Sequence, residues 1–254
     1  MVVTSSHKPQ LRALFASELQ QLYAFAYLML CSRSEARRAV DASARRLLAE
    51  PAHAAELLAE PNPNGALLGV IARDLDARLG RKAGRTFKVL DDILRSELTR
   101  PVDPSYSDPD KLHALLWELK RTCLTSVLSC LPPGVRMAFI LTDLMNFQPG
   151  PAAGLLKIKE SAYRVRLTRA RKRIEDYLTP RCQHVDVGNP CNCEGRLAIS
   201  LDKRFLRPPP HTKDIPEEPF DARSPHGTVM PLYRTLPAVQ LSNSRSQELL
   251  ALFD

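Results

Sequence analysis

The residues with the clearest chemical potential are a run of cations between Lys157 and Arg173. This segment holds eight Lys or Arg residues against one acid, Glu160, a net charge of +7 within a chain whose total is +8. Cations gathered on one surface bind phosphate groups, and each neutralised phosphate releases counterions from nucleic acid. The local basicity favours a nucleic-acid partner, although a solvated basic helix, or a helix that meets an acidic protein, would carry the same charge.

Helical periodicity separates these cations from a buried stripe. At about 100° per residue, one side of the segment collects Tyr163, Leu167, Ala170, Ile174 and Leu178. The apolar side can pack on a core while the other side offers cations to phosphates and short side chains to base edges. The candidate DNA-binding residues are therefore Ser161, Arg164, Val165, Thr168, Arg169 and Lys172.

A second group of reactive side chains follows the basic segment. Cys182, His184, Cys191 and Cys193 have the spacing C-x-H-x6-C-x-C. Thiolate sulfur and imidazole nitrogen are ligands of tetrahedral zinc, so the four residues are candidate metal ligands and zinc is a candidate cofactor. A redox-sensitive thiol cluster and an ordinary cysteine-containing tail are the alternatives. The other cysteines, Cys31, Cys123 and Cys130, lie in apolar helical settings where burial is expected.

The elements that precede the basic segment would position it. An apolar helix is predicted over Val135–Leu144, after a Leu131-Pro132-Pro133 start that suits a first helical turn. A short helix is predicted over Pro151–Leu156, and a turn over Lys157–Lys159 leads into the basic helix. A helix, a short helix, a turn and a basic helix are the layout of a helix-turn-helix, whose second helix enters the major groove of DNA.

These residues resemble a known family. The Leu131-Pro132-Pro133 start, the Phe139–Leu144 run and the Tyr163–Arg173 run, YRVRLTRARKR, are similar to region 4 of the extracytoplasmic-function (ECF) sigma factors of the sigma-70 family. The resemblance covers about 45 residues without a gap. It implies that the basic helix reads the promoter −35 element and that the partners are promoter DNA and core RNA polymerase. An anti-sigma factor is a further candidate partner.

The N-terminal part of the chain resembles sigma region 2. The Ser34–Ala42 segment, whose Ser34 is the expected N-cap of a helix over Glu35–Ala49, aligns with the helix that grips the polymerase. The resemblance implies that Arg37, Arg38 and Asp41 are polymerase-binding, although the family usually has acids where the two arginines stand. The Asn64–Arg81 segment is similar to the helix that engages the −10 element.

Composition and breaks predict an all-α protein of two small helical domains. Few Gly, 21 Pro and 6% aromatics favour helices separated by Pro-bearing breaks. We expect a region 2-like domain over 11–84, a linker over 85–111 with an extended Pro101–Pro109, a region 4-like domain over 112–178 and a Cys-bearing extension over 179–206. The Pro-rich tail, 207–254, is expected to be largely disordered, with Ser246–Phe253 either frayed or a short helix docked on this chain or a partner.

The sequence predicts a cytoplasmic transcription protein and not an enzyme. It has no apolar run long enough to span a membrane, no signal-peptide core and no phosphate loop or nucleophile elbow. The favoured interpretation is an ECF-type sigma factor that recruits core polymerase to promoters and requires no cofactor. The alternatives are a degenerate sigma-like regulator that binds DNA or an anti-sigma partner without supporting initiation, and a plain helix-turn-helix repressor.

Overall fold

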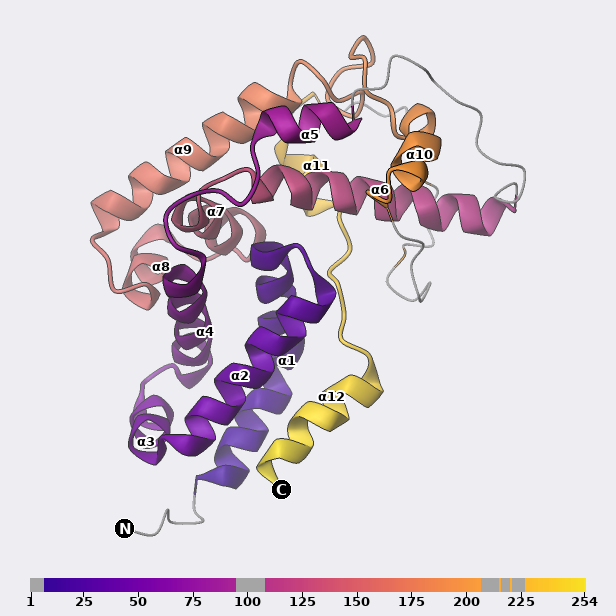
Figure 1. The fold of residues 1–254 in the computed structure, drawn as a ribbon. Coiled ribbons are helices and arrows are strands. Elements are labelled where there is room, and N and C mark those ends of the chain that lie inside the picture. Colours follow the sequence, from indigo (N-terminus) through magenta and orange to yellow (C-terminus); the bar gives the residue numbers. More distant parts are fainter. Residues whose placement is uncertain (1–6, 95–107, 207–214, 216–219, 221–226) are drawn as a thin grey trace.

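The structure, a computed structural model, describes residues 7–94, 108–206, 215, 220 and 227–254. Helices dominate these residues, and no named strand occurs among them, which confirms the all-α prediction (Figure 1). Among the same residues, no helix combines the length and the apolar character needed to cross a membrane. The elements are α1 (Lys8–Leu30), α2 (Arg33–Ala49), α3 (Pro51–Ala59), α4 (Pro63–Leu79), α5 (Phe87–Leu94), α6 (Pro109–Ser129), α7 (Pro133–Phe139), the π-helical η2 (Ile140–Leu144), α8 (Pro149–Leu155), α9 (Glu160–Leu178), α10 (Cys193–Asp202), α11 (Met230–Arg234), α12 (Asn243–Leu250) and the 3₁₀ turn η4 (Ala251–Phe253).

The first four helices form a bundle around the apolar face of α1. This helix ends at Cys31, which takes a left-handed conformation with φ of 54° and lets the chain reverse into α2. Ser32, and not the predicted Ser34, is the N-cap of α2, and its side chain accepts a hydrogen bond from the Glu35 amide at 3.3 Å. Ser32 and Glu35 have the spacing of a capping box, which explains the earlier start of the helix.

The next helices build a second group around α9. Pro133 starts α7, which continues as the π-helical turn η2, and the Tyr163 ring of α9 is fully buried beneath it. The Tyr163 hydroxyl donates to the Ala138 carbonyl at 3.0 Å and shares a 2.8 Å hydrogen bond with Thr142 Oγ1. Burial raises the pKa of Tyr163 to about 12, so the hydroxyl remains protonated at neutral pH and can donate.

Replacing Tyr163 with phenylalanine should lower the free energy of unfolding by about 1–2 kcal/mol, because the buried Ala138 carbonyl and Thr142 hydroxyl lose their partner while the ring still fills its site. Urea denaturation measures this change. The exposed Val165 on the same helix provides a control, since Val165→Ala removes no buried contact. Equal stabilities for the two variants would contradict the structural importance of this hydrogen bond.

The two groups of helices share one continuous apolar core. Gly69 of α4 lies against α8, since a Cβ atom there would meet the Leu155 carbonyl oxygen at 3.2 Å. Arg73 of α4 donates to the same carbonyl at 2.6 Å. Buried Arg136 of α7 donates to the Met29 carbonyl at the end of α1. The region 4-like helices are therefore held against the N-terminal bundle by polar as well as apolar contacts.

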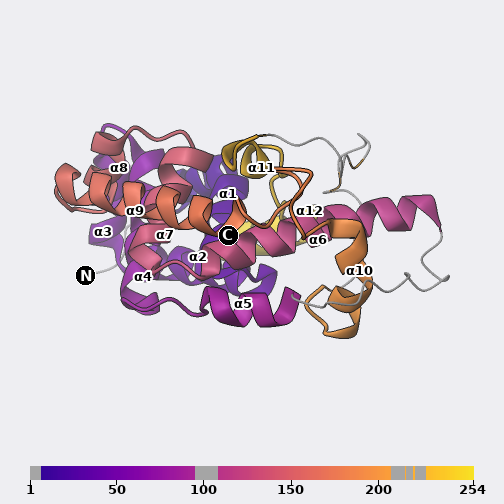
Figure 2. The same cartoon turned by 90° about the horizontal axis from the view of Figure 1, so that it is seen from above.

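The predicted linker, 85–111, lies partly within the described residues and partly outside them. The predicted helix over Phe87–Leu98 is present up to Leu94 as α5, and residues 95–98 lie outside the described residues. The Phe87 ring stacks on Tyr177 of α9 with centroids 4.5 Å apart. The predicted extended segment Pro101–Pro109 lies, up to residue 107, outside the described residues. Beyond it, α6 extends past the rest of the molecule and α10 lies beside it (Figure 2).

The C-terminal residues contain more helix than the sequence predicted. Helix α10 lies within the Cys-bearing extension, and α11, α12 and η4 lie within the predicted tail. Most of 207–226 lies outside the described residues, but 227–254 returns along the molecule and η4 reaches α1 and α2. Of the two possibilities for Ser246–Phe253, the structure has the docked helix, because Leu249 and Phe253 are buried against this chain.

Candidate functional site

The turn between α8 and α9 sets the orientation of the basic helix. Lys157 has a left-handed conformation with φ of 53°, and its amide donates to the Gly154 carbonyl at 3.0 Å. The next amide, that of Ile158, donates to the Ala153 carbonyl at 3.1 Å. These two bonds close the end of α8 before α9 begins at Glu160. The arrangement of a short helix, a tight turn and a long basic helix is that of a helix-turn-helix.

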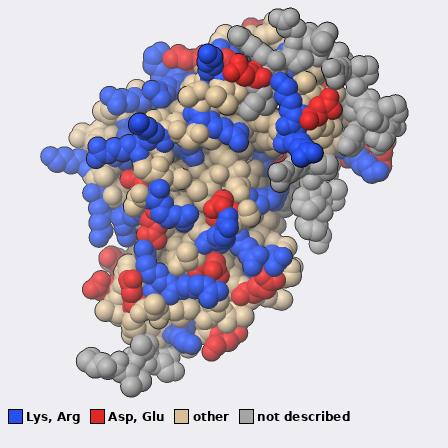
Figure 3. Space-filling view, in the orientation of Figure 1, with Lys and Arg blue, Asp and Glu red and all other residues tan. Residues whose placement is uncertain are grey.

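The exposed face of α9 gathers the predicted DNA-binding residues. The buried residues of α9 include the whole predicted apolar stripe, so the opposite face is left to solvent. Val165 on this face is 50% exposed, an accessible apolar group among polar ones. Lys and Arg side chains gather on the surface over α9 (Figure 3). All six predicted residues are exposed, namely Ser161, Arg164, Val165, Thr168, Arg169 and Lys172.

Ion pairs divide the cations of α9 into two kinds. Arg164 pairs with Glu160 at 2.7 Å and Lys172 pairs with Asp176 at 3.1 Å, and both are i,i+4 pairs between exposed groups. Such pairs are weak enough to exchange for phosphate. Arg171 instead makes two hydrogen bonds, at 2.9 and 2.6 Å, to the buried carboxylate of Asp143 in η2. The hydrogen bonds to Asp143 raise the pKa of Arg171, and this pair fixes α9 against η2.

Sequence reasoning did not identify Asp143 or Gly134 as supports of this face. A Cβ atom at Gly134 would meet the Arg166 guanidinium at 2.8 Å, so the glycine leaves room for the arginine over the start of α7. Asp143 is one of the few buried acids in the described chain. Asp143 lies in the Phe139–Leu144 run that resembles sigma region 4, and this position was the only sequence evidence for a role. Residue spacing could not identify its partner, Arg171, which lies 28 residues further along the chain.

The predicted polymerase-binding residues lie on a different surface, along α2. Arg38 pairs with Glu35 of the same helix, and Asp41 accepts a hydrogen bond from Arg45 at 2.9 Å. Arg37 reaches out of the helix and pairs with Glu248 of α12 at 3.0 Å. The structure therefore separates the candidate polymerase face on α2 from the candidate DNA face on α9 (Figure 1). Polymerase binding by these residues stays a prediction.

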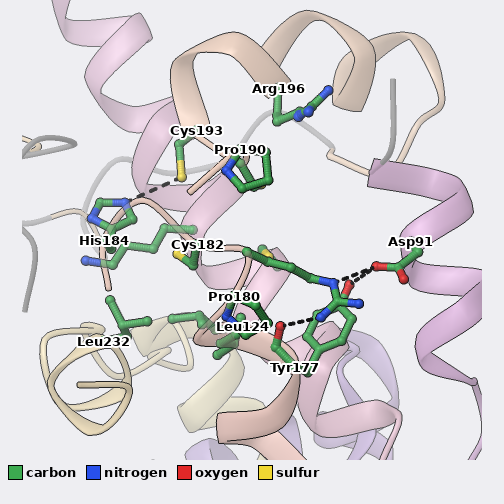
Figure 4. A pocket seen from close by; sticks show the side chains of 15 residues that line it. Asp91, Leu124, Tyr177, Pro180, Cys182, His184, Pro190, Cys193, Arg196 and Leu232 are labelled. Atoms are coloured by element: carbon green, nitrogen blue, oxygen red, sulfur yellow. Dashed lines mark hydrogen bonds and ion pairs between the residues drawn. The ribbon is translucent and has the colours of Figure 1, made fainter. Parts of the chain in front are cut away.

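The Cys-bearing extension folds around a pocket of about 420 Å³ beside the end of α9 (Figure 4). An isolated parallel β-bridge pairs residues Cys182 and Cys191, and the Cys193 sulfur lies 3.6 Å from His184 Nε2. Cys123 of α6 lines the same pocket, so the structure adds a fourth thiol that the sequence motif did not include. All four predicted ligands thus line one cavity.

The thiols of this pocket are in their neutral form at neutral pH. Burial raises the pKa of Cys123, Cys182, Cys191 and Cys193, and neighbouring thiols raise it further for Cys123, Cys182 and Cys193. Zinc binds thiolates, so binding here would first have to release protons. Within the described ranges, no group of three or more His, Cys, Asp or Glu side chains is arranged to hold a metal ion. Zinc at Cys182, His184, Cys191 and Cys193 stays a prediction.

In the native protein, Cys123 and Cys193 should react with a maleimide at neutral pH at least about tenfold more slowly than in denaturant, because both side chains are partly buried in the pocket and the raised pKa of each thiol keeps it protonated. Mass spectrometry of the modified peptides measures each rate. The same experiment after treatment with a chelator tests for zinc, since loss of bound metal would accelerate the reaction of its ligands. Rapid native labelling of Cys193 would contradict the burial of this thiol.

The comparisons with known proteins bear on the helix-turn-helix. A family profile described as "Sigma-70, region 4" matches residues 121–174, a segment that runs from α6 to near the end of α9. No solved structure matches the chain significantly.

Similarity to curated proteins is partial. The "Succinate--CoA ligase [ADP-forming] subunit beta" of Aeromonas hydrophila subsp. hydrophila is 35% identical over 70 residues, which is 28% of this chain and 18% of the relative. The protein with the same description from Photorhabdus laumondii subsp. laumondii is 30% identical over 98 residues, which is 39% of this chain and 24% of the relative. The chain spans about a fifth of the length of these curated relatives.

The region 4 match and the geometry of α8 and α9 agree on the same residues. The matched segment includes the turn at Lys157 and the full set of exposed side chains from Ser161 to Lys172. It covers the helices that carry the DNA face and leaves the α2 surface outside it. The match and the exposed basic helix together support a unit similar to sigma-70 region 4, with a DNA-binding role in transcription, within residues 121–174.

Proposed function

We propose that this protein is an ECF-type sigma factor that recruits core RNA polymerase to promoters in the cytoplasm. The observation that carries the proposal is the exposed basic face of α9, held by the α8–α9 turn inside the segment that matches sigma-70 region 4. In this proposal α9 enters the major groove at the −35 element, where its cations contact phosphates and its short side chains contact base edges.

The second surface of the proposal is α2. Arg37, Arg38 and Asp41 would contact core polymerase, and α4 would lie near the −10 element. Because the α2 and α9 surfaces are separate, the protein could contact polymerase through α2 while α9 and α4 contact the two promoter elements. The protein does no bond chemistry in this function, because the polymerase supplies the catalytic site.

Run-off transcription tests the proposal directly. Purified protein and core polymerase should together produce a defined transcript from a promoter selected by its binding to the protein. Core polymerase alone provides the baseline. Co-purification of the protein with core polymerase measures the first step separately from promoter opening.

A sigma-like regulator that does not support initiation is the second candidate function. The family usually has acids where Arg37 and Arg38 stand, and Arg37 is already paired with Glu248. Such a regulator would bind DNA through α9, or bind an anti-sigma partner, without opening promoters. DNA binding in the absence of both transcription and polymerase co-purification would favour it over the sigma factor.

A further inference from the structure

The C-terminal residues 241–254, here called the C-terminal strap, lie along the N-terminal bundle. They include α12 and η4 and pack beside α1, with η4 also reaching α2 (Figure 1). The chain arrives there from α11, where the buried Tyr233 hydroxyl donates to the Leu124 carbonyl at 3.2 Å. The strap therefore joins the far end of the sequence to its beginning.

Apolar contacts seat the end of the strap on α1. The Phe253 ring packs against Phe15 with centroids 5.0 Å apart, and Phe253 is only 3% exposed. Leu249 of α12 is buried to the same degree. A short terminal helix would ordinarily fray, so its two buried anchors are what hold it in place.

Polar contacts fix the register of the strap. The Gln20 side chain of α1 pairs with the backbone of Leu241, donating to its carbonyl at 3.1 Å and accepting from its amide at 2.9 Å. Arg12 of α1 pairs with Asp254 at 3.1 Å. These contacts join residues more than 200 positions apart, which gives the strap a defined seat on this helix.

The strap also contacts Arg37, a residue of the candidate polymerase face. Glu248 of α12 pairs with Arg37 of α2 at 3.0 Å and also accepts from Arg245 of its own helix at 2.8 Å. Both partners of the Arg37–Glu248 pair are partly exposed, at 41% and 48% of the side chain. Such a pair is screened by water and salt, so it holds the strap less firmly than the buried side chains do, whereas a cation in place of Glu248 would repel Arg37.

We propose that the C-terminal strap is an intramolecular competitor of core RNA polymerase at the α1–α2 surface, and that it must be displaced before Arg37 can contact polymerase. The proposal rests on the proposed function, since it regulates the same surface. Three buried side chains, those of Leu241, Leu249 and Phe253, and several exposed polar contacts hold the strap, so its release does not require the bundle to unfold.

The competition has a simple quantitative form. If polymerase binds only the open state, the apparent dissociation constant is the intrinsic constant divided by the fraction of open molecules. A strap that is open in about one molecule in ten would weaken polymerase binding about tenfold. Loosening the strap should therefore tighten binding without changing any residue of the α2 face.

Full-length variants of the strap test this expectation. In the first, Leu249 and Phe253 are both replaced with alanine, which removes two of the three buried side chains of the strap and leaves Leu241 in place. In the second, Glu248→Lys places a cation opposite Arg37 and changes only an exposed side chain, so it should fold like the wild type. Val187→Ala is a matched control, because Val187 is an apolar residue that is 63% exposed and lies outside the strap.

Two measurements follow for each variant. Hydrogen exchange of α1 and of residues 241–254 reports whether the strap has opened, and a binding titration with core polymerase gives the dissociation constant. Opening of the strap together with binding about tenfold tighter than the wild type would support the proposal, and the control should change neither quantity.

Each contrary outcome has a distinct meaning. If the wild type binds polymerase and an opened strap leaves the affinity unchanged or weaker, the competition is wrong and the proposed function stands. If hydrogen exchange in the wild type shows that the strap is already open, the strap cannot compete, and the proposal is overturned as well. If neither wild type nor variants bind core polymerase, the proposed function fails and the competition fails with it.

Discussion

Replacing Arg136 with methionine should lower the free energy of unfolding by about 3–5 kcal/mol, because it removes a buried cation that several backbone carbonyls share. Arg136 is 4% exposed and donates to the carbonyls of Leu128 at 2.8 Å, Ser129 at 3.0 Å and Leu131 at 3.2 Å, and to that of Met29.

The ends of two helices explain the size of this effect. Met29 lies in the last turn of α1, and Leu128 and Ser129 lie in the last turn of α6. The carbonyls at a helix C-terminus lack partners within the helix, and the helix dipole places partial negative charge there. Burial lowers the pKa of Arg136, yet a guanidinium remains charged in proteins. The methionine variant would remove this donor from all of these carbonyls, and only that of Leu128 would keep a backbone partner, the Leu131 amide at 3.0 Å, among the backbone hydrogen bonds of the described residues.

Urea denaturation with an unchanged denaturant slope would measure this loss of stability. Arg45→Met is a matched control, because Arg45 is an arginine whose side chain is 61% exposed and pairs with Asp41 of the same helix. The control should change stability by about 0.5 kcal/mol or less. Arg136→Lys should be intermediate, since an ammonium has fewer donors in a different geometry. A loss below about 1 kcal/mol for the methionine variant would mean that these carbonyls find other partners.

The features predicted from sequence are those with a local signal. The apolar stripe of α9 repeats every three or four residues, so the buried face from Tyr163 to Leu178 and the exposed face from Ser161 to Lys172 follow from periodicity alone. Proline marks the start of α7, where the missing amide costs nothing. The start of α8 was predicted at Pro151, but the helix begins two residues earlier, at Pro149, because either proline suits a first helical turn. The prediction of Ser34 as the N-cap of α2 was wrong because Ser32, two residues earlier, offers the same capping side chain.

The features missed from sequence depend on residues far apart in the chain. In the sequence, Arg136 is an ordinary cation at the start of an apolar helix. It becomes a buried link between helices only because the ends of α1 and α6 lie together around it. Asp143 and Arg171 are 28 positions apart, and Arg37 and Glu248 are 211 apart. Periodicity within one helix carries no information about such partners. Neither the Asp143–Arg171 contact that holds α9 nor the packing of the C-terminal strap on α1 could therefore be derived from it.

Replacing Arg164, Arg169 and Lys172 together with alanine should weaken promoter DNA binding by about 3 kcal/mol, roughly 150-fold, if each side chain contributes about 1 kcal/mol. These residues lie on the exposed face of α9, and the ion pairs of Arg164 and Lys172 are solvent-exposed. The helix should keep its place, because the buried stripe and the Arg171–Asp143 pair are untouched.

Salt dependence separates phosphate contacts from other effects. Each phosphate that a cation neutralises contributes about −0.9 to the slope of log affinity against log salt, so the triple variant should flatten this slope by two to three units if all three cations touch phosphate. Fluorescence anisotropy over a series of salt concentrations measures both affinity and slope. The Lys172→Ala single variant should flatten the slope by about one unit and weaken binding across sequences.

Lys111→Ala is the matched control for Lys172→Ala. Lys111 is also an exposed helical lysine paired with a nearby aspartate, Asp108 at 3.7 Å, but it lies at the start of α6 and outside the region 4 match. Its replacement should leave both affinity and slope unchanged. If the triple variant also binds DNA with the wild-type affinity and slope, α9 does not contact DNA, and its basic face is better explained by solvation or by an acidic protein partner.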